Sequence, residues 1–248
     1  MTLSIITASY NSEIYISECL SSTKGICEIS KNVEHIVFDG GSIDNTLKFA
    51  SSFDHVKIIQ SSGDKGVYDA FNKAVPFTNG KYILYLNSDD KFSCTKVKEL
   101  IKLLEVSNDL WFSGFINFID GEGKLIKKDV IKKKLNFNRF LISNTIRHPA
   151  TFVRREYLLK NKFDLKYSYA ADYAFFLKLW SSGNNPNVVP WIISSFRIWE
   201  SSLSSNFEKS IRDEFLVRQN WRESSNSSIL LKMIDSVIFY LRLLKLKI

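Results

Sequence analysis

The chain has 248 residues, of which 45% are hydrophobic, 24% charged and 14% aromatic. These proportions fall in the range of folded domains and exclude global disorder, collagen and low-complexity sequence. With 34 Lys and Arg against 26 Asp and Glu, the formal net charge is +8, which favours an anionic partner such as a nucleotide phosphate, a nucleic acid or an acidic lipid.

The cysteines indicate a reducing compartment. There are three, Cys19, Cys27 and Cys94, and no two of them have CxxC spacing. An odd number without that spacing argues against a disulfide framework or a zinc ribbon. The first residues lack the basic and apolar regions of a secretory signal, and we find no ordinary transmembrane helix. We therefore expect a cytoplasmic protein.

The first part of the chain alternates between strand-like and helix-like segments. We predict strands over 3–7, 35–38, 56–59 and 82–86, and helices over about 13–23, 44–53 and 66–75. Strand, polar loop and helix in repeated order are typical of βαβ units, so we expect an α/β fold with a mainly parallel sheet. Such sheets bind their ligands beyond the carboxyl ends of the strands.

The second part of the chain has a less regular pattern. We predict strands over 111–119, 150–153 and 188–196, and helices over 96–106, 171–180, 207–221 and 229–246. Between them, residues 124–139 hold seven Lys and Arg but one acid, Asp129. We expect that run to be a solvated or mobile segment near an acceptor; contact with a lipid pyrophosphate is the alternative.

Three polar clusters follow predicted strands. They span residues 7–11, 39–42 and 87–90. Because the carboxyl ends of parallel strands share one edge of a sheet, we expect these clusters to converge there.

Asn87-Ser88-Asp89-Asp90 carries the most chemistry of the three clusters. Two adjacent carboxylates form a hard oxygen site of the kind that Mg²⁺ or Mn²⁺ prefers, usually together with phosphate oxygens. The alternative is that Asp89 or Asp90 caps the next helix near Ser93.

Two glycine-containing loops offer weaker signals. In Asp39-Gly40-Gly41-Ser42, the glycines allow close approach of a ligand and Asp39 could accept a base N–H; a tight strand-to-helix turn is the alternative. Asp64-Lys65-Gly66 precedes a helix whose N-terminus favours negative charge, and Lys65 could add a charge for a phosphate. A solvated loop with ordinary capping is the alternative there.

Four motifs taken in order resemble glycosyltransferase family 2, in particular its bacterial members that build capsule, O-antigen and colanic-acid-type polysaccharides. They are SIITASYN at 4–11, DGGSIDNT at 39–46, GDKGVYDAFNK at 63–73 and LNSDD at 86–90. The match is close over residues 3–90 and looser to about residue 205.

This resemblance implies a GT-A fold, a Rossmann-like sheet flanked by helices, followed by C-terminal helices. We accordingly assign a catalytic domain to 1–205, with a nucleotide-sugar half at 1–95 and an acceptor half at 96–205, and a helical extension to 206–248. The resemblance also implies the residues that bind the nucleotide sugar: Thr7, Tyr10, Asn11, Asp39, Asp64, Lys65, Asn87, Ser88 and Asp89.

Within that set, Asp39 would contact the base, and Asn87-Ser88-Asp89 would occupy the family's DxD position. The first acid of DxD is Asn87 here, which leaves Asp89 as the ligand of Mn²⁺ or Mg²⁺. Asp90 would assist or cap.

The resemblance also places a catalytic base in the second part. Similar enzymes carry an acidic pair where this chain has Ala171-Asp172, so Asp172 alone would be the base; a helix N-terminal charge is the alternative. His148 would lie on the acceptor side or be structural. Where related enzymes often have a Gly-Gly-x-Ser loop, this chain has Trp199-Glu200-Ser201-Ser202.

The resemblance therefore implies a metal-dependent inverting glycosyltransferase. It would transfer a sugar from a nucleotide-sugar donor, expected to be UDP-linked, to a saccharide or lipid-linked acceptor. A non-catalytic nucleotide-sugar-binding or membrane-scaffolding member is the alternative, because Asn87 and Ala171 depart from the pattern. We expect no nucleic-acid partner, since the aromatic residues do not interleave with a basic stripe.

The C-terminal helix is the predicted contact with a membrane. Apolar residues of 229–248 recur at helical spacing beside Lys232, Arg242, Lys245 and Lys247. This pattern suits an interfacial helix on an anionic membrane; packing on the catalytic domain or in a homodimer is the alternative. The resemblance implies lipid-linked acceptors, and hence the cytoplasmic face of the inner membrane.

Overall fold

The computed structural model describes residues 1–129, 134–200, 206–225 and 229–244. Several residues singled out above lie outside these ranges. They are part of the basic run, the pair Ser201-Ser202, and the last cationic residues Lys245 and Lys247.

The predicted parallel βαβ units are present. β1 (Leu3–Ser9), β2 (Val33–Asp39), β3 (Val56–Gln60) and β4 (Tyr82–Tyr85) pair in parallel in the order β3-β2-β1-β4. The helices between them are α1 (Ile16–Ile29), α2 (Thr46–Ala50) and α3 (Val67–Ala74), and the short η1 (Val75–Phe77) follows α3. The prediction for this part of the chain is confirmed, with α1 beginning later and ending later than expected.

The second part of the chain extends the same sheet with mixed directions. β8 (Thr151–Arg154) is antiparallel to β4, and β6 (Trp111–Ile119) is antiparallel to β8. β9 (Asn187–Arg197) runs parallel to β6, and β5 (Lys91–Phe92) pairs with β9. With β7 (Leu125–Lys128) beside β6, the described residues form a nine-stranded sheet.

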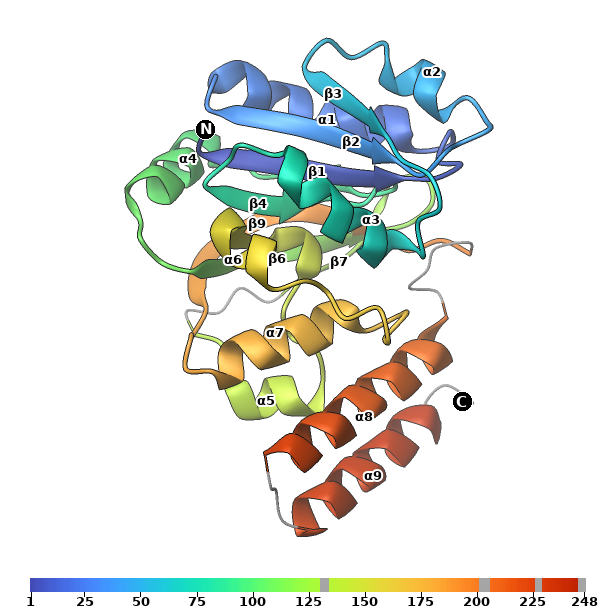
Figure 1. Ribbon diagram of the computed structural model, residues 1–248, viewed down its shortest axis with the longest axis vertical. Coiled ribbons are helices and arrows are strands. Elements are labelled where there is room, and N and C mark those ends of the chain that lie inside the picture. The colour runs from blue at the N-terminus through green and yellow to red at the C-terminus, as the bar shows by residue number, and fades with distance from the viewer. Residues whose placement is uncertain (130–133, 201–205, 226–228, 245–248) are drawn as a thin grey trace.

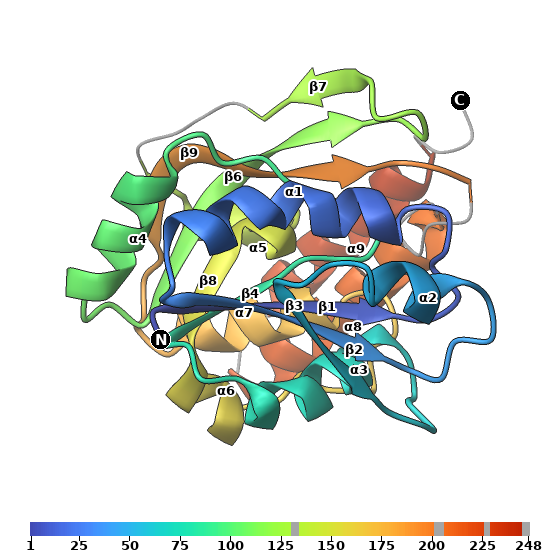
Figure 2. The same cartoon turned by 90° about the horizontal axis from the view of Figure 1, so that it is seen from above.

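Helices cover both faces of the sheet (Figure 2). α1 and α4 (Val97–Val106) lie on one face, and α3, α6 (Arg155–Lys160) and α7 (Ala171–Ser181) lie on the other. The side chains of β1 point alternately to the two faces. Leu3 and Ile5 face the α1 and α4 side, whereas Ile6 and Ala8 pack with Phe71 of α3. All seven residues of β1 are buried, including the polar Ser4, Thr7 and Ser9, so the strand has no solvent-exposed face.

Apart from the short 3₁₀ turns η1 and η2 (His148–Ala150), four short elements were not predicted from the sequence. They are β5, β7, α5 (Phe137–Ile142) and α6. Of these, β7 lies in the basic run and has all four residues exposed. An exposed edge strand needs no apolar alternation, so its sequence carries no strand signal. The expectation of a solvated segment holds for these four residues.

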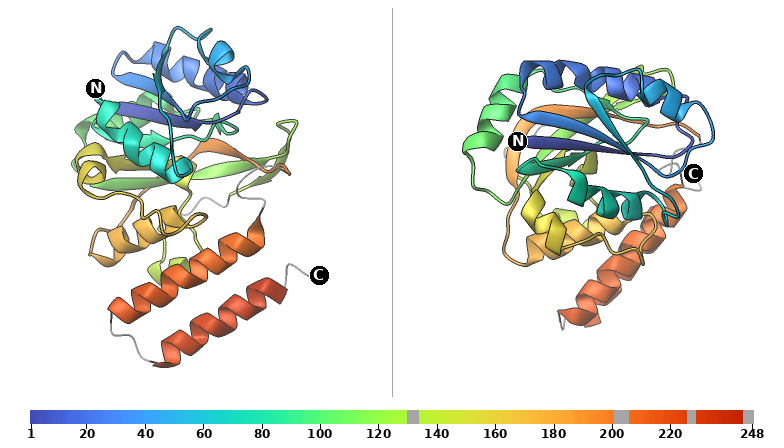
Figure 3. Two further views of the ribbon diagram at one scale, coloured as in Figure 1. Left: turned by 45° about the vertical axis from the view of Figure 1, so that its right-hand side comes forward. Right: turned by 45° about the horizontal axis from the view of Figure 1, so that its top comes forward.

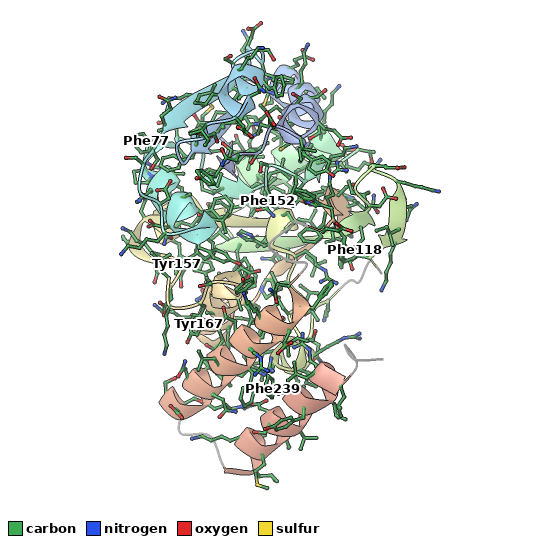
Figure 4. All side chains as sticks on the ribbon, turned by 90° about the vertical axis from the view of Figure 1, so that its right-hand side faces the viewer. Phe77, Phe118, Phe152, Tyr157, Tyr167 and Phe239 are labelled. Atoms are coloured by element: carbon green, nitrogen blue, oxygen red, sulfur yellow. The ribbon has the colours of Figure 1, made fainter. Side chains whose placement is uncertain are left out.

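Two long helices end the described chain. α8 (Phe207–Ser224) and α9 (Ile229–Leu244) form an antiparallel pair beyond α7 (Figures 1 and 3). Phe239 lies between them, stacked on Phe215 with ring centroids 4.4 Å apart (Figure 4). Among the described helices, none is long and apolar enough to span a membrane.

Candidate active site

A cavity of about 870 Å³ opens at the carboxyl ends of β1, β2, β3 and β4. Its walls come from both parts of the chain: the loops after these strands, the start of α3, the segment before β8, the start of α7 and one face of α8. The sheet edge at which we expected ligands to bind is therefore hollowed, and α7 and α8 close its far side.

The cavity collects most of the residues predicted for the site. Those on its wall are Tyr10, Asn11, Asp64, Asn87, Ser88, Asp89, His148 and Asp172. Three predicted residues, Thr7, Asp39 and Lys65, do not line it.

Thr7 and Asp39 lie behind the wall. The Thr7 hydroxyl is buried against His35 Nε2 at 2.9 Å. The Asp39 carboxylate accepts from the Ser9 and Ser42 hydroxyls at 2.9 and 2.6 Å and from the amides of Gly41 and Ser42 at 3.0 and 2.8 Å. Asp39 thus builds the strand-to-helix turn considered above, and Gly41, at φ +90°, allows that turn.

The β1–α1 loop is tied to this turn. The Asn11 amide donates to Ser42 Oγ at 2.9 Å, and Asn11 Oδ1 accepts from the Ile43 amide at 3.0 Å. Asn11 has a φ of +48°, which is uncommon for a residue other than glycine. The neighbouring Tyr10 remains 64% exposed, so its ring is free to contact a ligand.

Asp64 presents an unsatisfied oxygen. Its Oδ1 accepts from Lys73 Nζ at 2.6 Å and from Ser61 Oγ at 2.9 Å, whereas its Oδ2 is buried and has no hydrogen-bond partner among the described residues. A Cβ at Gly40 would lie 3.2 Å from this Oδ2, so glycine there keeps the approach open. Lys65, next to it, has an exposed side chain, and its amide donates to Asp69 Oδ2.

The two carboxylates after β4 have different environments. Asp89 lines the cavity, and its Oδ2 accepts from Trp199 Nε1 at 2.8 Å. Burial raises the pKa of Asp89, and the indole hydrogen bond opposes that rise. Asp90 is buried, and it accepts from Asn87 Nδ2 at 3.0 Å and from the Arg197 amide at 2.9 Å.

Burial, followed by repulsion from Asp89, holds the pKa of Asp90 well above its usual range. The capping interpretation for this pair is wrong, because α4 begins at Val97 with Lys96 at its N-cap and no side-chain cap.

A buried arginine that no sequence pattern singled out, Arg197, connects the segments around Asp89. Arg197 donates from Nε to the Asp89 carbonyl at 2.8 Å and from Nη1 to the carbonyls of Asp120 and Gly121 at 3.0 and 2.9 Å. It also pairs with Glu18, and its guanidinium lies 4.3 Å from the Tyr15 ring centroid. Its contacts are long-range, so no local sequence pattern reveals them.

Asp172 is held at the start of α7. Its Oδ1 accepts from the Tyr68 hydroxyl at 3.1 Å and its Oδ2 from Asn144 Nδ2 at 3.4 Å. Burial raises the pKa of Asp172. The two hydrogen bonds partly offset this rise, because they stabilise the ionised carboxylate. A carboxylate with a raised pKa inside a cavity is suited to accept a proton.

His148 lies on the same wall. Its ring packs near Tyr85 and Phe71, with centroids 5.2 and 5.6 Å away. Burial lowers the pKa of His148 to about 3, so the imidazole is neutral at ordinary pH. Its Nε2 is buried without a partner among the described residues, which leaves one polar atom for a ligand or a water.

Comparison with known proteins shows the family of this chain. The family model described as glycosyl transferase family 2 matches residues 4–163, well over half of the chain. The chain belongs to glycosyltransferase family 2. It is therefore a glycosyltransferase, as the motifs indicated.

Two curated relatives show what this glycosyltransferase is similar to. A UDP-Glc:alpha-D-GlcNAc-diphosphoundecaprenol beta-1,3-glucosyltransferase, WfgD of Escherichia coli, is 28% identical over 227 residues, which cover 90% of this chain and 87% of that one. A PGL/p-HBAD biosynthesis glycosyltransferase of Mycobacterium bovis is 30% identical over 199 residues, 75% of this chain and 71% of its own.

Solved structures confirm the GT-A-like fold of the glycosyltransferase. S. aureus TarS 1–349 in complex with UDP-GlcNAc superposes with a TM-score of 0.71 at 19% identity, covering 98% of this chain and 72% of that one. The mannosyltransferase PcManGT of Pyrobaculum calidifontis, in complex with GDP-Man and Mn²⁺, gives 0.69 at 14% identity over 96% and 69%.

The residues of the glycosyltransferase suit a divalent cation shared with a ligand. The described residues contain no group of three His, Cys, Asp or Glu side chains that could hold a metal alone. Mg²⁺ is commonly bound by one or two carboxylates together with substrate phosphates. Asp89, on the cavity wall, offers one such carboxylate.

Some contributors to the site were missed in the sequence. Tyr68 lies inside a recognised motif but was assigned only to a helix, and Asn144 lies in a segment without a pattern. Ser210 and Glu214 of α8 also line the cavity, although we had assigned α8 to an extension outside the catalytic domain.

Tyr68→Phe is expected to shift the acid limb of the pH–rate profile for sugar transfer to higher pH. The Tyr68 hydroxyl stabilises ionised Asp172 and so lowers its pKa; without it the pKa of Asp172 rises and the base is protonated at higher pH. Measuring kcat/KM against pH checks this. Tyr157→Phe, a half-buried tyrosine off the cavity wall, is the control, and coincident limbs for Tyr68→Phe and the parent would contradict the role.

Proposed function

We propose that the chain transfers a sugar from a UDP-linked donor to a lipid-linked or saccharide acceptor, with inversion and with Mn²⁺ or Mg²⁺, in surface polysaccharide synthesis. The observation that carries the proposal is that Asp64, Asp89 and Asp172 line one cavity of about 870 Å³. The donor and acceptor classes are those in the name of the E. coli relative, and UDP-GlcNAc is the ligand of TarS.

The donor nucleotide would lie along the first half of the sheet edge. Asp64 Oδ2, buried and unpartnered among the described residues, is suited to accept an N–H of the base, because an unmade hydrogen bond there costs about 1–3 kcal/mol. The exposed Tyr10 ring would contact the base or ribose. Asp39 and Asn11 would act by fixing the two loops that line this end, with Thr7 packed beneath them.

The diphosphate would lie beside the Asn87–Asp89 segment. Asp89 would hold the divalent cation together with diphosphate oxygens, and Ser88, whose hydroxyl lies 2.9 Å from Ser12 Oγ, would line the same place. When bound, the cation supplies Lewis-acid stabilisation of the charge that develops on the leaving diphosphate. Lys65 is exposed between Asp64 and Gly66, two residues of the cavity wall, and would add positive charge there.

Asp172 would accept the proton of the acceptor hydroxyl as that oxygen forms a bond to the anomeric carbon and the bond to the diphosphate breaks. One displacement of this kind inverts the anomeric centre without a protein nucleophile. His148, neutral and with a free Nε2, would contact the acceptor beside Asp172.

Ligand-dependent stability tests the donor. In the presence of Mn²⁺, UDP-glucose or UDP-N-acetylglucosamine is expected to raise the Tm, because a ligand that binds only the folded form stabilises it by about 2.7 kcal/mol at 100 times its Kd. GDP- and dTDP-sugars are expected to raise it less. A larger shift with a GDP-sugar would contradict the UDP assignment.

The outward face of α9 supports peripheral membrane binding. Its inner face combines the buried Phe239 with ion pairs: Asp235 is buried and accepts from Arg222 Nε at 3.0 Å, and Arg242 pairs with Glu214 of α8. Its outer residues are exposed and apolar: Leu230, Met233, Ile234, Val237, Tyr240, Leu241 and Leu244. An apolar stripe left outside in this way is typical of a contact with a membrane or a partner.

The double variant Met233→Asp/Val237→Asp is expected to bind anionic phosphatidylglycerol vesicles at least about tenfold more weakly than the parent, since burial of one such side chain contributes about 1.5–3 kcal/mol. Both residues are exposed, by 61% and 58%, so folding should be preserved. Vesicle pelleting measures the effect, with Ile43→Asp, 90% exposed on another surface, as control. Equal pelleting by all three proteins would contradict membrane binding, and a dimer lost only in the double variant would assign the stripe to a homodimer.

A further inference from the structure

Trp199 is fixed at both its backbone and its ring. The preceding residue, Ile198, donates its amide to the Ile119 carbonyl at 2.9 Å and so continues the pairing of β9 with β6. The Trp199 ring meets Tyr15 edge-on, with centroids 5.0 Å apart and planes at 75°. Tyr15 in turn lies over the Arg197 guanidinium. The indole is therefore positioned by packing before any ligand binds.

Arg197 and Trp199 hold the same residue from two sides. Arg197 Nε binds the backbone carbonyl of Asp89, and Trp199 Nε1 binds its side-chain Oδ2 at 2.8 Å. Both contacts join residues far apart in the sequence, because β9 brings Arg197 and Trp199 to the segment after β4. The main chain and the side chain of Asp89 are therefore both restrained.

A packing role alone does not account for this arrangement. Trp199 is half-buried and lines the cavity itself, and its polar atom is directed at the carboxylate rather than at solvent. Hydrogen-bonded partners of metal-binding carboxylates orient the ligand, and their loss typically lowers metal affinity by about 10–100-fold. Asn87 stands where a second acid would help to hold a cation, so the orientation of Asp89 matters more.

We propose that Trp199 is the positioning residue for Asp89: its indole N–H occupies Oδ2 and leaves Oδ1 as the oxygen offered to the divalent cation and the donor diphosphate. This inference rests on the proposed function, because it assumes that Asp89 holds a cation. It adds a residue from the far end of the sheet to the binding machinery.

The test is direct binding of Mn²⁺ in the presence of UDP, followed by the electron paramagnetic resonance signal of free Mn²⁺. Trp199→Phe keeps an aromatic ring against Tyr15, removes the N–H and makes the side chain smaller. We expect it to bind Mn²⁺ about 10–100-fold more weakly, while binding of UDP without metal and the Tm stay as in the parent. Trp191→Phe, on β9 but off the cavity wall, is the matched control and should bind Mn²⁺ like the parent.

The outcomes separate this inference from the proposed function. Equal Mn²⁺ affinity of Trp199→Phe and the parent would overturn the role of Trp199 and leave the metal site standing. A parent that binds no Mn²⁺ with UDP would overturn both. If Trp199→Phe has a lowered Tm, Trp199→Tyr, which keeps an aromatic ring and a hydrogen-bond donor, decides: recovery of Mn²⁺ affinity supports the role, and affinity as weak as that of a Trp199→Leu variant of equal Tm overturns it.

Discussion

Asp172→Asn is expected to lower the rate of sugar transfer by roughly 10²–10⁴-fold, the usual cost of losing a positioned general base. The amide has the shape of the carboxyl group, and its oxygen can still accept from Tyr68 or Asn144, so the start of α7 should keep its structure. It cannot accept the hydroxyl proton. Donor binding should be unchanged, because Asp172 is assigned to the acceptor.

Initial rates of transfer with a saturating UDP-sugar, together with the Kd for UDP, measure this separation. Asp164→Asn is the control, since Asp164 is an exposed aspartate in the segment leading to α7. Transfer by Asp172→Asn at the parental rate would remove Asp172 from the role of base. A weakened UDP affinity would instead show that the change disturbs the donor half.

Asp89→Asn is expected to lower transfer by about 10²–10³-fold, comparable to the loss of one group that stabilises developing charge. The Asn side chain removes the negative charge that would bind the cation, while its oxygen can still accept from Trp199. The activity that remains should require a much higher Mn²⁺ concentration, because the metal would then be held chiefly by the diphosphate.

Titration of the transfer rate with Mn²⁺ checks the role of Asp89. The matched control is Asp90→Asn: its carboxyl group is adjacent in sequence but buried off the cavity wall, and its contacts are with Asn87 and Arg197. We expect that variant to be less stable but to keep the parental Mn²⁺ dependence. The reverse pattern, with Asp90→Asn losing metal dependence, would transfer the metal role to Asp90.

The parallel half of the fold could be predicted because each of its strands is apolar, short and followed by a polar cluster. The polar ends of β1, β3 and β4 then had to meet at one edge, and Asn11, Asp64 and Asp89 do so. The weaker elements could not be predicted. β7 is exposed on all four residues and α6 has six residues, so neither has enough periodicity to be recognised.

The hydrogen-bond partners of individual side chains in the site also could not be predicted from the sequence. Asp39 ends β2 and Asp64 follows β3, each beside glycines, yet Asp39 has four protein donors whereas one oxygen of Asp64 has no partner among the described residues. The difference arises from the turn at Gly41, which returns two amides to Asp39. Tyr68, Arg197 and Trp199 reach the site through contacts between distant segments, which no local pattern encodes.

The configuration of the sugar released from UDP-α-D-glucose tests the central claim most directly, because slow hydrolysis of the donor needs no knowledge of the acceptor. With Mn²⁺, and with both Asp89 and Asp172 intact, nuclear magnetic resonance should show β-D-glucose as the first product, and chelation of the metal should abolish the reaction. Release of α-D-glucose, an equal rate without metal, or no turnover of any UDP-sugar with or without an acceptor would contradict a metal-dependent inverting transferase.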